Sequence, residues 1–214
     1  MEIRPPDTAL RTLDTLEWVG GHTAIDFANT VGDVYSAHPK PYLHGYEDLL
    51  AWCQQADLIG PNGRRHLSAG SERAKASAFK ESEELNATLR TLFTATARHE
   101  TLPQTALDHL NALVHKTAPW RRIRACEDED QGRRVSCGWD FKDAPPYAVL
   151  GPIVWRAVEL LETGPIDRVK ECADDDCRWL FLDTSKNRSR QWCSMENCGN
   201  RSKVRRFRSK RKTA

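Results

Sequence analysis

The stretch that decides the fold runs from Glu171 to Lys212 and reads ECADDDCRWLFLDTSKNRSRQWCSMENCGNRSKVRRFRSKRK. It holds four of the seven cysteines as two C-x4-C pairs, Cys172 with Cys177 and Cys193 with Cys198. Each short loop can fold back as a knuckle, and two facing knuckles give the tetrahedral sulfur cage that Zn²⁺ prefers. Because four protein ligands close such a site, the pattern predicts one structural zinc ion rather than a catalytic one.

Four ordinary thiols, or two disulfides, are the alternative interpretation of the same cysteines. The usual knuckle is C-x2-C, and x4 lies at the long end of the range found in zinc sites. A Cys₂His₂ site is disfavoured because no histidine follows His115. The repetition of one spacing favours the metal site.

A basic segment follows the last cysteine. Residues 201–212 hold eight Lys or Arg in twelve positions. Residues 178–214 hold 12 Lys and Arg against 2 Asp and Glu, a net charge of +10, whereas residues 1–177 carry a net of −8. A basic arm on an acidic body indicates a polyanionic partner, so the arm is predicted to bind nucleic acid. The predicted contact residues are Arg188, Arg190, Arg201, Lys203, Arg205, Arg206, Arg208 and Lys210.

The basic tail and the aspartates of the first knuckle also allow other interpretations. The tail can be a solvated cationic end with only non-specific attraction, whereas a membrane-surface helix is disfavoured because only Val204 and Phe207 can enter lipid. These two residues, three apart, are expected to cover the zinc knuckles together with Trp192. Residues 174–176, three aspartates in the first knuckle, are expected to form a solvated loop that repels phosphate rather than a second metal site.

The same stretch also resembles a known family. The run Cys198-Gly-Asn-Arg201, preceded by Arg190-Gln-Trp-Cys-Ser-Met195 and Phe181-Leu-Asp-Thr-Ser185, resembles the CGNR zinc finger of bacterial proteins. In that family the finger is C-terminal and follows a domain called ABATE, described as a "putative stress-induced transcription regulator". Residues 25–30 and 43–58 resemble the start of that domain. The resemblance is strong over 172–206 and weaker over 17–165, and it implies a zinc site and a regulatory function.

Length and composition indicate one ordinary domain plus a small module. The chain has 214 residues, of which 39% are hydrophobic, and its longest apolar stretch is too short to span a bilayer. The N-terminus has no apolar run typical of a signal peptide, so a cytoplasmic protein with reduced cysteines is expected. The turn residues Thr163-Gly164-Pro165 predict a boundary between an ABATE-like domain, 1–165, and the finger, 166–214.

The predicted fold class is α+β: a mostly helical N-terminal domain with a small antiparallel sheet, then a treble-clef or ribbon-like finger ending in a basic helix. Apolar periodicity predicts helices over about 46–56, 71–99, 103–116 and 147–162, with a strand at 23–27. Alternation predicts a hairpin of 121–126 with 135–141. If that hairpin turns at Gln131-Gly132, Cys126 lies opposite Cys137 and the two thiols are close enough to oxidise. The finger is expected to contain strands at 168–172 and 178–182 and a helix at 199–211.

No catalytic constellation is found in the sequence. The histidines show no H-x3-H or H-E-x2-H pattern, and no G-x-S-x-G, P-loop or G-x-G-x2-G motif occurs. Asp26, Asn29 and Thr30 are candidates for lining a ligand pocket, with turn and cap hydrogen bonding as the alternative.

Three functions fit the sequence. The first, which we predict, is a DNA-binding transcription regulator whose N-terminal domain senses a small-molecule effector or forms a homodimer. The second is an RNA-binding accessory protein using the same finger. The third is an enzyme with its site in the N-terminal domain, which the absence of a catalytic motif disfavours.

Overall fold

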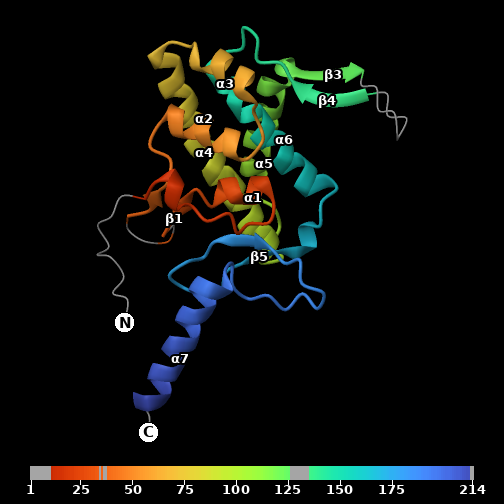
Figure 1. The fold of residues 1–214 in the computed structure, drawn as a ribbon. Helices are drawn as coiled ribbons and strands as arrows, with labels where there is room; N and C mark the ends of the chain where they lie inside the picture. Colours follow the sequence, from red (N-terminus) through yellow and green to blue (C-terminus); the bar gives the residue numbers. More distant parts are fainter. Residues whose placement is uncertain (1–10, 34, 36–37, 126–134, 213–214) are drawn as a thin grey trace.

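In the computed structural model, a bundle of helices packs against the C-terminal finger (Figure 1). The structure describes residues 11–33, 35, 38–125 and 135–212, and the side chains of these residues up to 208. The bundle contains α2 (Tyr46–Gln55), α3 (Pro61–Ser68), α4 (Glu72–Ala97), α5 (Gln104–Thr117) and α6 (Leu150–Glu162). The four helices predicted from periodicity are thereby confirmed, and the α+β class with them.

Helix α4 is the centre of the body. The hydroxyl of Ser71 accepts a hydrogen bond from the amide of Ala74 (3.3 Å) and begins the helix. Its apolar stripe is fully buried and packs against α1 and α5; the stripe consists of Ala78, Leu85, Leu89, Leu92 and Phe93. Each leucine or phenylalanine of this stripe contributes about 1.5–3 kcal/mol by leaving water. Because α4 also contacts β5, it supports the finger as well as the bundle.

The segment predicted as a strand over 23–27 is a helix, α1 (Thr23–Ala28). His22 caps the N-terminus of α1, because its Nδ1 accepts a hydrogen bond from the amide of Ala24 (3.2 Å). The prediction failed because α1 is buried on all sides from Ala24 to Ala28. A short helix buried all round shows no 3.6-residue period and cannot be distinguished from a buried strand by pattern alone.

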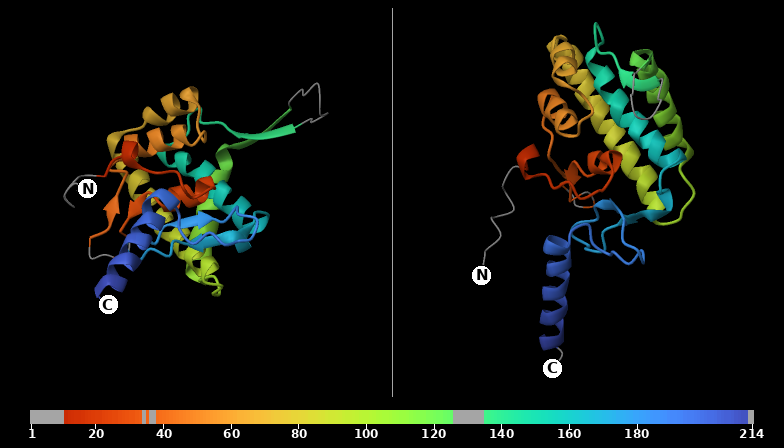
Figure 2. Two further views of the ribbon diagram at one scale, coloured as in Figure 1. Left: turned by 60° about the horizontal axis from the view of Figure 1, so that its bottom comes forward. Right: turned by 45° about the vertical axis from the view of Figure 1, so that its right-hand side comes forward.

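Three antiparallel strand pairs complete the described fold: β1 (Val31–Gly32) with β2 (Lys40–Pro41), β3 (Arg121–Ala125) with β4 (Val135–Trp139), and β5 (Val169–Glu171) with β6 (Leu180–Leu182). The β3–β4 hairpin projects from the body at the end opposite α7 (Figure 2).

The register predicted for the β3–β4 hairpin is wrong. Cys137 lies opposite Ile123, three positions from the predicted partner Cys126, which itself lies outside the described residues. The base of the hairpin fixes the register: the Arg121 guanidinium lies 4.1 Å from the ring centroid of Trp155 on α6. On the paired strand, the Trp139 ring lies against Gly151, where a Cβ atom would come within 2.4 Å of it. Packing against α6, rather than the turn sequence, therefore sets the pairing.

The finger shares its core with the helical body. Leu180 and Phe181 of β6 are fully buried in the same apolar cluster as Ile25 and Leu85. The boundary after α6 is therefore a boundary in the sequence, while in space the two segments pack together. From this base α7 (Asn200–Lys212) projects away from the rest of the molecule (Figures 1 and 2).

Candidate metal centre and basic helix

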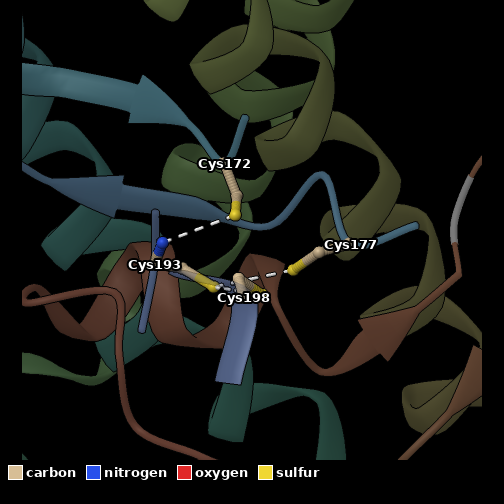
Figure 3. A group of neighbouring side chains, drawn as sticks. All are labelled: Cys172, Cys177, Cys193 and Cys198. Atoms are coloured by element: carbon tan, nitrogen blue, oxygen red, sulfur yellow. Dashed lines mark hydrogen bonds between the residues drawn. The ribbon is translucent and has the colours of Figure 1, made fainter. Parts of the chain in front are cut away.

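Four cysteine side chains converge at the root of α7 (Figure 3). All four sulfur atoms lie within 4.8 Å of one another, with Cys177 3.5 Å from Cys193 and Cys193 3.7 Å from Cys198. Cys172, Cys193 and Cys198 are buried and Cys177 is partly exposed. A sulfur tetrahedron around Zn²⁺, with bonds of about 2.3 Å, has edges of about 3.8 Å. The four sulfurs therefore fit a closed tetrahedral metal site.

Backbone turns hold the two knuckles in shape. In the first, the carbonyl of Asp174 accepts hydrogen bonds from the amides of Cys177 (2.8 Å) and Arg178 (3.1 Å), and Arg178 adopts a left-handed conformation (φ 55°). In the second, the Ser194 hydroxyl accepts a hydrogen bond from the amide of Asn197 (3.3 Å) at the start of a π-helical turn, Met195–Gly199. The turn leads directly into α7, so the helix begins at a metal ligand.

Asp174 connects the first knuckle to α7 through a buried carboxylate. Its side chain is fully buried and accepts hydrogen bonds from Arg201 (Nε 2.9 Å) and from Arg205. Arg201 also donates a hydrogen bond to the sulfur of Cys198 (3.0 Å). The expectation of a solvated aspartate loop is therefore wrong for Asp174, although Asp175 and Asp176 are exposed. A buried carboxylate between two guanidinium groups fixes the direction of α7 relative to the metal site.

The comparisons with known families agree with this geometry. The model of the CGNR zinc finger matches residues 168–211. The model of the ABATE domain, described as a "putative stress-induced transcription regulator", matches residues 21–164, about two thirds of the chain. The chain belongs to the ABATE family. The search among curated proteins found no match. The architecture expected from the sequence, an ABATE domain followed by a CGNR finger, is confirmed.

Within the CGNR finger, Arg190 is committed to internal contacts rather than to the surface. Its guanidinium donates hydrogen bonds to the carbonyls of Trp192 (2.9 Å) and Cys193, and lies 4.5 Å from the ring centroid of Phe181. It reaches the ABATE domain at the carbonyl of Val19 (3.4 Å). The structure therefore gives Arg190 a structural role at the joint, whereas its contact with nucleic acid stays a prediction.

Asp183 organises the loop between β6 and the second knuckle. The side chain is fully buried and accepts hydrogen bonds from Lys170 (2.6 Å), from the amide of Arg190 (3.1 Å), and from the amide and hydroxyl of Ser185. Burial alone would raise the pKa of Asp183, but the Lys170 ammonium and the Ser185 donors hold that pKa well below its usual range. The carboxylate therefore stays charged and pins the loop. Arg188, on this loop, pairs with Asp167 at the surface (2.5 Å).

The remaining predicted nucleic-acid contacts lie on α7. Lys203, Arg205, Arg206 and Arg208 are exposed, whereas Arg201 is half-buried; Lys210 lies on the helix beyond the described side chains. Val204 and Phe207 are 48% and 62% exposed, so the expectation that they cover the knuckles is wrong. A cleft of about 650 Å³ runs beside it, with Tyr42, Trp179 and Arg208 in its walls.

Asn29, one of the predicted pocket residues, joins the ABATE domain to the finger. Its side-chain amide donates to the carbonyl of Leu180 (2.8 Å) and its carbonyl accepts from the amide of Leu180 (3.0 Å). Asn29 is fully buried and thereby acts as a neighbouring strand for β6. The amide of Leu182 adds a hydrogen bond to the carbonyl of Gly20 (2.8 Å). The turn-and-cap alternative thus fits Asn29 better than a role in ligand binding.

Asp26 and Thr30 also make hydrogen bonds within the ABATE domain. The carboxyl of Asp26 accepts a hydrogen bond from the amide of Gly20 (2.7 Å), and burial raises the pKa of Asp26 to about 6. The hydroxyl of Thr30 donates a hydrogen bond to the carbonyl of Phe27 (2.8 Å) and accepts one from the side-chain amide of Asn86 (3.0 Å). Thr30 also lines a cavity, together with Phe27, Leu43 and Phe79.

Sequence reasoning missed the burial of Asp174 and the structural role of Arg201 beside the cysteines. Asp174 is one of three consecutive aspartates, and nothing local distinguishes the buried one from its exposed neighbours. Arg201 was identified as a cation near the metal, but its partners come from the other knuckle. Contacts across a loop of more than twenty residues leave no signal in spacing or composition.

Proposed function

We propose that the protein is a zinc-dependent, non-catalytic transcription regulator of the cytoplasm that binds DNA through its CGNR finger and α7. One Zn²⁺ per chain, held by the four cysteines, anchors the helix, and the ABATE domain senses a small-molecule effector or forms a homodimer. In the described part of the chain, every helix is too short or too polar to cross a membrane.

The observation that carries this proposal is the projection of α7 from a fixed base (Figure 2). Lys203, Arg206 and Arg208 are exposed along it, and Asp174 fixes its first turns through Arg201 and Arg205. A cationic helix held away from an acidic body can approach a phosphate backbone without repulsion from that body. The contacts with phosphates position the protein, and they carry no sequence preference by themselves.

The test measures the affinity of the full-length, zinc-loaded protein for duplex DNA by fluorescence anisotropy over a range of salt concentrations. If about six cations of α7 meet phosphates, log K falls with log salt at a slope of about −5. Lys203→Glu and Arg208→Glu are expected to weaken binding to all sequences alike. Arg73→Glu on α4, an exposed arginine of the ABATE domain, is the matched control and is expected to bind as the wild type does.

Two results would overturn the proposal: an affinity that barely changes with salt, or variants of α7 that bind as tightly as the Arg73 control. A parallel titration with RNA of the same sequence distinguishes the RNA-binding alternative, since a preference for RNA assigns the finger to that partner. Elemental analysis of the purified protein tests the metal: one zinc per chain is expected, and a chain purified in the presence of zinc without bound metal contradicts it.

A further inference from the structure

A groove runs along α4 in the ABATE domain, and its opposite wall contains Val31, Pro39, Pro41 and Leu43. It consists of two adjoining cavities of about 520 and 210 Å³, which share Val31, Pro39, Glu83 and Asn86 in their walls. Each volume suits part of a small organic molecule, and together they are in the range of ligand pockets in proteins.

The smaller cavity has an apolar wall. Phe27, Leu43 and Phe79 line it, together with the two prolines of the opposite wall. The hydroxyl groups in the same wall already donate inside the protein, Thr30 to the carbonyl of Phe27 (2.8 Å) and Ser82 to the carbonyl of Phe79 (2.6 Å). The wall therefore presents a surface for a hydrocarbon ring or a short aliphatic chain.

The larger cavity contains a half-buried cation, Arg90. Its guanidinium donates a hydrogen bond to the carbonyl of Ala28 (3.3 Å), and it forms no ion pair with any carboxylate of the described residues. Burial lowers the pKa of Arg90, because the charged form loses hydration there. A guanidinium has five N–H donors, so most of its capacity is available to a ligand. Glu83 and Glu100 also line the cavity, but both are exposed to solvent.

The groove is adjacent to the joint with the CGNR finger. Val31, in the wall of both cavities, accepts a hydrogen bond from the indole of Trp179 (3.3 Å) through its carbonyl. Thr30 lines the smaller cavity and follows Asn29, which holds Leu180 of the finger. An occupant of the groove therefore contacts Val31, which bonds to the finger, and Thr30, which is adjacent to Asn29 in the sequence.

We propose that this groove binds a small monocarboxylic acid, with its carboxylate on Arg90 and its apolar ring or chain against Phe27 and Phe79. A carboxylate supplies Arg90 with a direct ion-pair partner in addition to the more distant charge of Glu171, and the apolar end lies in the smaller cavity. Its role as the effector of the regulator rests on the proposed function, whereas the binding itself does not.

The experiment uses the full-length, zinc-loaded protein without nucleic acid, so that it does not depend on DNA binding. Isothermal titration compares 3-phenylpropionate and hexanoate with their neutral amides. We expect the acids to bind and the amides to bind at least about tenfold more weakly, since a neutral amide cannot form a charge-assisted hydrogen bond with Arg90. Arg90→Gln is expected to remove this preference, and Arg73→Gln on the same helix is the matched control.

Two further variants keep the test independent of whether Arg90→Gln folds. Arg90→Lys keeps the charge and is expected to retain preference for the acids. Ala87→Phe places a ring in the groove from an exposed position of α4, and is expected to abolish acid binding while leaving the circular dichroism spectrum unchanged. Equal binding of acids and amides, unchanged binding by Ala87→Phe, or no binding of either acid at about 10 mM would overturn the proposal.

A last measurement concerns the effector role. The affinity for duplex DNA is determined with and without 3-phenylpropionate, in the wild type and in Ala87→Phe. A change in the wild type alone supports regulation through the groove. Acid binding with unchanged DNA affinity removes the effector role, and the absence of DNA binding altogether contradicts the proposed function while leaving the acid site intact.

Discussion

The ABATE domain and the CGNR finger are stabilised in different ways. In the ABATE domain, apolar side chains fill the interior, and Asp26 is the one charged residue among the buried side chains that the structure describes there. The finger buries two charged carboxylates, Asp174 and Asp183, beside four clustered thiols. Stability falls gradually as apolar contacts are lost from a core, whereas removing the partner of a buried charge lowers the free energy of unfolding by several kcal/mol in one step. We therefore expect the loss of the metal or of a charged partner to unfold the finger while the ABATE domain stays folded.

The largest expected effect is the loss of the metal. Cys193→Ser, or removal of zinc by a chelator, should unfold the finger, because structural Zn²⁺ contributes on the order of 10–16 kcal/mol in finger peptides. Hydrogen exchange should become fast over 172–199 and stay slow in the centre of α4. Cys53→Ala, which changes a buried thiol outside the cluster, is the control and should keep the finger protected. Protection of 172–199 that survives zinc removal would mean that the metal does not stabilise the finger.

Next in size is the removal of the Asp174 carboxylate. Asp174→Ala should lower the free energy of unfolding by about 3 kcal/mol, since Arg201 and Arg205 lose their hydrogen bonds to the buried carboxylate while Arg205 keeps its pair with Asp176. The first turns of α7 should lose protection in hydrogen exchange. Asp175→Ala is the matched control, because the Asp175 carboxylate is exposed and, among the described residues, pairs only with Arg178. Equal effects of the two substitutions would show that burial of Asp174 does not hold the helix.

The third prediction concerns Asp26, a buried carboxyl group that makes the stability of the ABATE domain depend on pH. Its pKa is raised from 3.8 to about 6, so ionisation opposes folding, and stability should fall as the pH rises from about 4 to 7. Asp26→Asn should remove that loss and be up to about 3 kcal/mol more stable than the wild type at pH 7, with no difference near pH 4. Denaturant unfolding at several pH values measures this. Asp14→Asn, at an exposed carboxyl, is the control; an Asp26→Asn variant with the wild-type pH profile would contradict the prediction.

The smallest expected effect is at the joint between the two regions. Asn29→Ala should cost about 2 kcal/mol, because it leaves the buried amide and carbonyl of Leu180 without partners. Hydrogen exchange at Leu180 should accelerate while the centre of α4 is unchanged. Thr91→Ala, on the exposed face of α4, is the control. If protection is lost equally in both regions, the joint and the body unfold as one unit.

The metal site was predictable from the sequence and its surroundings were not. Cysteine spacing encodes ligand geometry directly, so two repeated pairs were enough to locate the cluster. The burial of Asp174 depends on Arg201 and Arg205 in the first turns of α7, and cysteine spacing does not encode these contacts. The same applies to Arg190, whose partners include a carbonyl from the start of the chain.

In the body, the long helices were predictable because they are amphipathic, with one buried and one exposed face. Helix α1 was missed because it has no exposed face from which a period could be read. The hairpin register was missed because Trp139 and Arg121 fix it against α6. In each case a contact distant in the sequence decided the local structure.

The pairing of Asn29 with Leu180 limits how the finger can be exchanged between proteins. The finger alone would expose Leu180 and Phe181, which are fully buried only against α1 and the rest of the body. A chimaera that grafts residues 166–214 onto another protein would therefore aggregate unless it also carried residues 20–31, the segment that receives β6. The portable unit of this architecture is the finger together with the first helix of the domain before it.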